Sequence, residues 1–139
     1  HPRWLRVCDL PAPTTGLEAK FSYRLTAAMA LSGRDTGDLG SFTDALCAEP
    51  GLVALRDKVR VEGDEGISET AAQVEVELAD GSRHSLSHDL EAPITLQERG
   101  AKLRAKARSL LGPEAEGRLW AAADAAAPDL GALADLLQQ

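Results

Sequence analysis

Two cations, a hydroxyl and a phenol lie within five consecutive positions near the N-terminus, at Lys20, Ser22, Tyr23 and Arg24. Ammonium and guanidinium groups bind carboxylates and phosphates through charge-assisted hydrogen bonds, and a hydroxyl or phenol can add a neutral donor. These four residues are therefore candidates for binding a small anionic substrate. Residue types alone favour the alternative of a solvated helix face, in which the Lys20 and Arg24 stems cover apolar surface.

The element that must position these residues is predicted to be one helix from Gly16 to Leu31. Thr15 followed three residues later by Glu18 is a capping box, in which each side chain binds the backbone N–H of the other residue. Gly33 supplies the stop. Cations in the early turns oppose the helix dipole, which prefers Asp or Glu there. An anion bound by free N–H groups at the helix start would remove this conflict.

The same helix is predicted to have two faces that differ in polarity. An apolar stripe at helical spacing should face the core and consists of Leu17, Phe21, Leu25 and Ala28. The candidate anion-binding residues fall on the neighbouring face, together with Ala27.

The run from Gly16 to Ser22, GLEAKFS, with the alanine-rich stretch and the glycine behind it, resembles the signature of the C-terminal domain of the MmgE/PrpD family. Weaker motifs follow in the family's order: Ser41–Asp44, Leu55–Val61, Leu78–Gly81, Pro93 and a leucine-rich tail. The family includes 2-methylcitrate dehydratase, cis-aconitate decarboxylase and iminodisuccinate epimerase, which act on small di- and tricarboxylates. The resemblance implies that residues 1–139 are the smaller of two domains, and that the larger, helical N-terminal domain is absent from this chain.

The resemblance further implies that the parent protein is a lyase or isomerase, independent of metals and other cofactors, that removes a proton next to a carboxylate. Lys20, Ser22, Tyr23 and Arg24 would then bind the substrate, and the unidentified proton-transfer residues are expected in the N-terminal domain. Some members have a tyrosine three positions after the motif serine, where this chain has Leu25. Dehydration, decarboxylation and epimerisation therefore stay open.

The expected partners of the chain are a small polycarboxylate, its own N-terminal domain and a second copy in a homodimer. The isolated chain is expected to fold without turnover. The alternative is a non-catalytic interaction or dimerisation module, in which the apolar stripe and the C-terminal helices pack against a partner.

Length and charge narrow the class of protein. The chain has 139 residues and a net charge of −7, which is enough length for one domain with its own core. No basic cluster is interleaved with aromatic residues, which argues against a nucleic-acid or anionic-membrane surface. No apolar run approaches the ~20 residues of a membrane span.

Cys8 and Cys47 lack metal-ligand spacing and indicate reduced thiols in a cytoplasmic protein, although a disulfide stays open.

The most regular pattern in the chain is an alternation that predicts a β-hairpin, with strands over Ala72–Ala79 and Ser82–His88. A three-residue loop with Gly81 in a left-handed conformation places the apolar side chains on one face. A two-residue turn would exchange the faces and is rejected. The cross-strand pairs that follow are Val74 with Leu86, Val76 with His84 and Glu77 with Arg83.

Helices and short strands are predicted around the hairpin from periodicity, caps and proline positions. The strands are Trp4–Cys8 and the alternation from Val59 to Glu62. The helices are Leu39–Ala48, Leu52 toward Arg60, Thr95 to Gly112 with a second capping box at Glu98, Pro113–Ala126 and Asp129–Leu137. The fold class is α+β, a small antiparallel sheet with a central hairpin packed against several helices.

The spacing of the histidines and of the glycines argues against metal and nucleotide sites. His84 and His88 are four positions apart, but on a strand their Cα atoms lie ~13 Å apart. Neither Gly37–Gly40 nor Gly63–Gly66 has the spacing of a nucleotide-binding glycine motif. The sequence therefore predicts no metal and no cofactor.

Overall fold

The computed structural model describes residues 1–124, 131 and 134–135 and divides the chain into two compact units. The first unit contains His1–Thr36 and Gly40–Pro93, and the second contains Gly37–Leu39 and Ile94–Gln139. The expectation of a single domain over residues 1–139 stays a prediction. No helix among the described residues is both long and apolar enough to cross a membrane.

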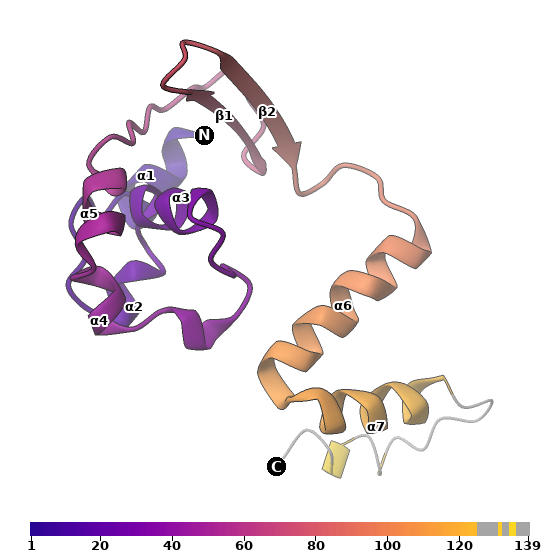
Figure 1. Ribbon diagram of the computed structural model, residues 1–139. Helices are drawn as coiled ribbons and strands as arrows, with labels where there is room; N and C mark the ends of the chain where they lie inside the picture. The colour runs from indigo at the N-terminus through magenta and orange to yellow at the C-terminus, as the bar shows by residue number, and fades with distance from the viewer. Residues whose placement is uncertain (125–130, 132–133, 136–139) are drawn as a thin grey trace. The chain divides into compact units, whose positions relative to one another are not determined.

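Short helices, one hairpin and two longer helices follow one another along the chain (Figure 1). The helices of the first part are η1 (Pro2–Trp4), α1 (Leu5–Cys8), α2 (Gly16–Ala19), α3 (Tyr23–Leu31), η2 (Leu39–Ser41), α4 (Asp44–Cys47) and α5 (Pro50–Arg56). The remaining elements are the strands β1 (Ala71–Glu77) and β2 (Arg83–Asp89) and the helices α6 (Leu96–Leu111) and α7 (Pro113–Ala123). This order confirms the α+β class.

The core of the first unit lies where α3 packs on α5, α2 on α4 and α4 on α5. Its buried apolar side chains are Ala19, Leu25, Ala28, Met29, Leu46, Cys47 and Leu52. Phe42 and Leu55 pack against this cluster from its margin. The core therefore ties the segment that carries the candidate residues to the helices that follow it.

The predicted helix from Gly16 to Leu31 is interrupted, and this is a correction to the sequence-based interpretation. Ser22 has an extended backbone, with φ −118° and ψ 100°, and caps a new helix, α3. Its backbone forms an antiparallel bridge with Asp9, and the amide of Leu10 donates to the carbonyl of Phe21 at 3.1 Å. A helix that continued through Ser22 could not form this pairing with Asp9 and Leu10. The pairing therefore ends α2 at Ala19.

The interruption also corrects the predicted apolar stripe. Leu25 and Ala28 are fully buried as expected, but Leu17 is 68% exposed and Phe21 is 39% exposed. Because α2 and α3 are separate helices, a helical spacing that runs across the break does not define one face.

Three other predicted elements are wrong. Trp4–Cys8 is helical rather than a strand, because Pro2 starts a 3-10 turn that His1 caps by accepting from the amide of Arg3. Leu39–Ala48 is not one helix, since Thr43 is extended and caps α4 separately. Val59–Glu62 forms no strand, and the helix before it, α5, runs from Pro50 to Arg56.

The hairpin prediction is confirmed in register and turn. Val74 pairs with Leu86, Val76 with His84 and Glu77 with Arg83. Gly81 has φ +82°, the left-handed conformation that a glycine adopts without strain. The apolar face of the hairpin is open, with Val74 51% exposed and Leu86 73% exposed.

The helices α6 and α7 pack against each other in the second unit. The capping box of Thr95 and Glu98 starts α6 as predicted, and Gly112 at φ +83° separates the two helices. The helix α7 ends at Ala123 rather than Ala126. Most of the predicted helix Asp129–Leu137 lies outside the described residues.

A buried carboxylate joins α6 to α7. Glu116 on α7 is 1% exposed and accepts from Arg104 Nε at 2.7 Å and from Arg108 Nη2 at 3.2 Å. Arg104 also lies over the ring of Trp120, 5.2 Å from its centroid. The hydrogen bond from Arg104 is the main cause that lowers the pKa of Glu116 below its usual value of 4.5.

Acidification is expected to destabilise this helix pair. The unfolded chain protonates Glu116 at a higher pH than the folded chain, so the ion pairs stabilise the fold fully above about pH 4.5. This stabilisation is lost as the pH falls through the lowered pKa of the folded state. Thermal melting followed by Trp120 fluorescence, in a Trp4→Phe background, should show a melting temperature that falls below pH 4.5.

Two glutamine variants test whether Glu116 is responsible. Glu116→Gln should lower the melting temperature at pH 7 and flatten its dependence on pH. Glu114→Gln changes a carboxylate that is 89% exposed and 3.9 Å from Arg118, so it should keep the wild-type profile. A Glu116→Gln variant that melts like wild type at pH 7 would contradict the assignment.

Candidate functional site

The N-terminal amides of α2 are bound by carboxylates of the chain itself. Glu18 Oε2 accepts from the amides of Thr14 and Thr15 at 2.7 and 3.2 Å, and Thr15 Oγ1 accepts from the amide of Glu18 at 3.2 Å. Asp44 Oδ1 accepts from the amide of Gly16 at 2.7 Å. The capping box is confirmed, but the amides of Gly16 and Glu18 at this helix start are bound within the chain rather than free for an external anion.

The contact between Gly16 and Asp44 is one of several that bring two sequence motifs together. Gly16 lies so close to the backbone of Phe42 and Thr43 that an added Cβ would be 2.9 Å from Phe42 C and 3.1 Å from Thr43 Cα. The Cys47 thiol also donates to the carbonyl of Thr15, at 3.3 Å. The segment Gly16–Ser22 therefore packs directly on the segment Ser41–Asp44.

Lys20 lies at the end of α2, where it caps the helix C-terminus. A cation there is favoured by the helix dipole, so the prediction that Lys20 opposes the dipole is wrong. Its side chain is exposed, and its ammonium group lies 6.0 Å from the ring centroid of Phe42. Lys20 thus presents a positive charge beside the contact between the two motifs.

Ser22 is buried, with 1% exposure. Its hydroxyl donates to the carbonyl of Leu10 at 2.6 Å and accepts from the amide of Leu25 at 3.2 Å. The hydroxyl therefore caps α3 and fastens the preceding segment to it. Through this cap, Ser22 fixes the start of α3, where Tyr23 and Arg24 lie.

Arg24 is held by an acid that sequence reasoning did not single out. Its Nε donates to Asp9 Oδ1 at 3.2 Å, and the two side chains are 32% and 23% exposed. This pairing balances the positive charge of Arg24 in the first turn of α3. A guanidinium has four further N–H donors, so Arg24 can contact a second carboxylate while Asp9 orients it.

Tyr23 is the first residue of α3 and is 41% exposed. Partial burial raises the pKa of its phenol above the usual 10.0, and an interaction with the Cys8 thiol raises it further. The phenol is therefore protonated at neutral pH and can donate a hydrogen bond. Neither Cys8 nor Asp9 could be foreseen as a neighbour. Cys8 belongs to the segment that was wrongly predicted to be a strand, and Asp9 follows that segment directly.

The four predicted residues thus lie on either side of the break between α2 and α3. Lys20 closes the first helix beside Phe42, and Tyr23 and Arg24 open the second beside Cys8 and Asp9. The group offers two cations and one neutral donor, which is suited to holding carboxylates and to stabilising negative charge.

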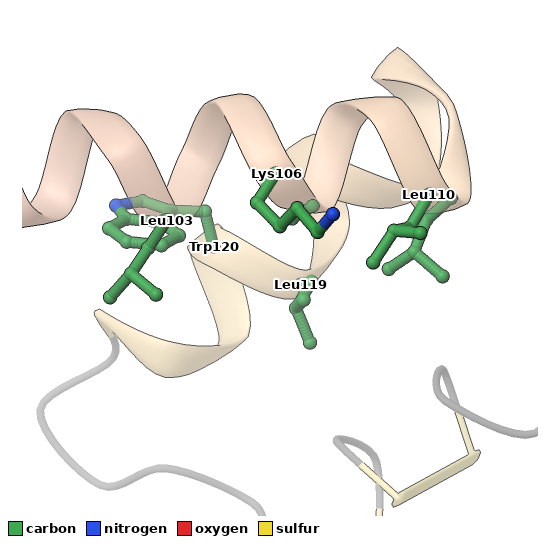
Figure 2. Close-up of a pocket in the computed structure, with 7 residues that line it drawn as sticks. Leu103, Lys106, Leu110, Leu119 and Trp120 are labelled. Atoms are coloured by element: carbon green, nitrogen blue, oxygen red, sulfur yellow. The ribbon is translucent and has the colours of Figure 1, made fainter. Parts of the chain in front are cut away.

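A hollow of about 350 Å³ lies between α6 and α7 (Figure 2). It is lined by Leu103, Lys106, Ala107, Leu110, Leu111, Leu119 and Trp120. The lining is apolar apart from Lys106, and a di- or tricarboxylate needs several convergent donors. This hollow is therefore suited to packing of apolar groups rather than to binding such a substrate.

The histidines that could suggest a metal pair, His84 and His88, both lie on β2, as predicted. Within the described part of the chain, no group of three or more His, Cys, Asp or Glu side chains is arranged to hold a metal ion.

Comparison with known proteins gives one clear match. The sequence model of a family described as the MmgE/PrpD C-terminal domain matches residues 1–127. No curated protein and no solved structure matches the chain. The matched range includes both of the motifs that pack together at α2 and α4.

Proposed function

Because the chain belongs to the MmgE/PrpD family, as its C-terminal domain, we propose that it is part of a lyase or isomerase that acts on a small di- or tricarboxylate. The family is generally enzymatic. The reaction proposed is removal of a proton next to a carboxylate, without a metal or other cofactor. The observation that carries this proposal is the family match over residues 1–127, which includes the segment with Lys20, Tyr23 and Arg24.

Each residue has a proposed role that follows from its surroundings. Lys20, which is exposed, binds one substrate carboxylate. Arg24, oriented by Asp9, binds a second carboxylate or the same one from another side. Tyr23 donates a hydrogen bond from its neutral phenol, which stabilises the charge that develops when the proton leaves. Ser22 positions Tyr23 and Arg24 by capping α3.

A larger helical N-terminal domain is the proposed partner of this surface and the source of the proton-transfer residues. Apolar side chains are exposed around the candidate site, with Leu10 and Phe21 each 39% exposed and Leu17 68% exposed. Burying these side chains against another domain would also exclude water from the substrate, which strengthens electrostatic interactions. The isolated chain is accordingly expected to fold without turnover.

Deuterium incorporation tests the reaction class without presupposing the product. The full-length protein is incubated in D₂O with a panel of di- and tricarboxylates, and exchange at the carbon next to each carboxylate is followed by NMR. We expect exchange with at least one acid for the full-length protein and none for the 139-residue chain alone. The same full-length protein catalysing no exchange and no turnover across the panel would contradict the proposal.

A second candidate function is a non-catalytic interaction module, which the exposed apolar side chains around Phe21 favour. That function predicts a binding partner but no chemistry that depends on Lys20. The two candidates therefore differ in the kinetic effect of a Lys20 substitution.

A further inference from the structure

The strand β2 has an outer edge that, among the described residues, pairs with no other strand. Among the described residues, the sheet consists of β1 and β2 alone. An isolated two-stranded sheet is only marginally stable in water, and an open edge is a template for pairing with another chain. Within the described part of the chain, the hairpin therefore has no third strand to extend the sheet.

The hydrogen bonds of the hairpin fix which groups of β2 point outward. The amide of Leu78 donates to the carbonyl of Ser82 at 2.9 Å, and the amide of Leu90 donates to the carbonyl of Thr70 at 3.1 Å. Hydrogen-bonded and non-hydrogen-bonded pairs alternate along an antiparallel ladder. In the observed register, the outward N–H and C=O groups of β2 are therefore those of Arg83, Ser85, Ser87 and Asp89.

The residue order of β2, Arg-His-Ser-Leu-Ser-His-Asp, reads the same in both directions from its centre at Leu86, except at its ends, where Arg83 and Asp89 carry opposite charges. We infer that β2 pairs with β2 of a second copy of this chain, antiparallel, about a twofold axis at Leu86. Arg83 then lies opposite Asp89 of the second copy at both ends of the pairing. Ser85 lies opposite Ser87 of the second copy. The Arg83–Asp89 and Ser85–Ser87 pairs are the ones that use the outward backbone groups of β2.

The pairing suits both faces of the resulting four-stranded sheet. On one face, Leu86 meets its equivalent in the second copy and extends the apolar row begun by Val74. Leu86 is 73% exposed in the single chain, so this contact removes apolar surface from water. On the other face, Arg83 already pairs with Glu77 at 2.7 Å and would lie between two acids.

Other pairings of the same hairpin are less complementary. The register centred on Leu86 is the one that pairs all seven residues of β2, and it joins opposite charges at both ends. A β1 to β1 pairing centred on Val74 would place Gln73 opposite Glu75 and Ala71 opposite Glu77, with no ion pair. The twofold β2 pairing does not depend on the proposed enzymatic function.

Charge substitution at the twofold axis tests the pairing, because one residue meets its own copy there. The mass of the wild-type chain in solution, measured by analytical ultracentrifugation from micromolar to millimolar concentration, should rise from one to two copies. Leu86→Lys and Leu86→Glu should each weaken dimerisation by about 10-fold or more, since like charges would face each other. An equimolar mixture of the two variants should recover the dimer as a heterodimer. Leu96→Glu, at a residue that is 86% exposed on α6, should dimerise like wild type.

Proline substitution provides an independent test through the backbone. Ser85 has its N–H on the outer edge of β2, so Ser85→Pro blocks the pairing while leaving the hairpin ladder intact. Glu75, opposite Ser85 on β1, has its N–H on the other edge, so Glu75→Pro is the matched control. We expect a monomer for Ser85→Pro and a dimer for Glu75→Pro. A wild-type chain that stays monomeric at all concentrations, or dimers of Leu86→Lys and Ser85→Pro as stable as wild type, would overturn the inference.

Discussion

Lys20→Ala in the full-length protein is expected to lower kcat/KM by about 30- to 900-fold, which corresponds to about 2–4 kcal/mol of lost transition-state stabilisation. The reason is that Lys20 offers an exposed ammonium group in the segment proposed to hold a substrate carboxylate. The change is measured by steady-state kinetics on whichever acid the deuterium experiment identifies.

Two matched lysine variants separate charge from other effects. Lys20→Arg keeps the positive charge and should retain much more activity than Lys20→Ala. Lys58→Ala removes a lysine that is exposed just after α5 and should leave kcat/KM unchanged. Wild-type kinetics for Lys20→Ala, together with weaker association with a partner, would instead support the interaction module.

The stability of Lys20→Ala should change little and in the unfavourable direction. The substitution removes a cation from the C-terminal end of α2 and an exposed contact with the Phe42 ring at 6.0 Å. An exposed cation–π contact is worth about 0.5–1 kcal/mol. A larger loss of stability would mean that the kinetic effect includes misfolding, and the melting temperature of the same variant decides this.

Local patterns predicted the hairpin and both capping boxes correctly. The hairpin register followed from alternation and a single glycine, and Gly81 does adopt the left-handed conformation. Thr15 and Thr95 cap their helices through residues only three positions away. Such features need no information about distant parts of the chain.

The break at Ser22 could not be predicted, because its cause lies twelve residues away in sequence. The side chain and backbone of Ser22 bind Leu10 and Asp9, and nothing in the sequence around Ser22 indicates these partners. The missed break also made the predicted site wrong, because one continuous helix from Gly16 to Leu31 placed Lys20 in an early turn. In the structure, Lys20 ends one helix and Arg24 begins the next.

The neighbours of the candidate residues could not be predicted from the sequence. Asp9 beside Arg24, Cys8 beside Tyr23 and Phe42 beside Lys20 all come from other parts of the chain. These neighbours determine what each side chain can do. Arg24 is oriented by an acid, burial and Cys8 raise the pKa of the Tyr23 phenol, and Lys20 is the more exposed of the two cations.

Gly16→Ala is expected to lower the free energy of unfolding by about 3 kcal/mol, because the site has no room for a methyl group. The added Cβ would be 2.9 Å from Phe42 C and 3.1 Å from Thr43 Cα, and nearer still to the Phe42 carbonyl oxygen. All three are backbone atoms, which cannot rotate away as a side chain would. Thermal or urea unfolding of the 139-residue chain measures the loss, which should lower the melting temperature by about 10 °C or more.

Gly51→Ala is the matched control, since it makes the same chemical change in a helix with open space. No heavy atom outside its immediate neighbourhood lies within 4 Å of an added Cβ at Gly51, and alanine is favoured over glycine in helices by about 0.5–1 kcal/mol. This variant should therefore be as stable as wild type or slightly more stable. If Gly16→Ala unfolded like Gly51→Ala, the close packing of α2 on the Phe42 backbone would be wrong. The position of Lys20 beside Phe42, on which its proposed role rests, would then be wrong as well.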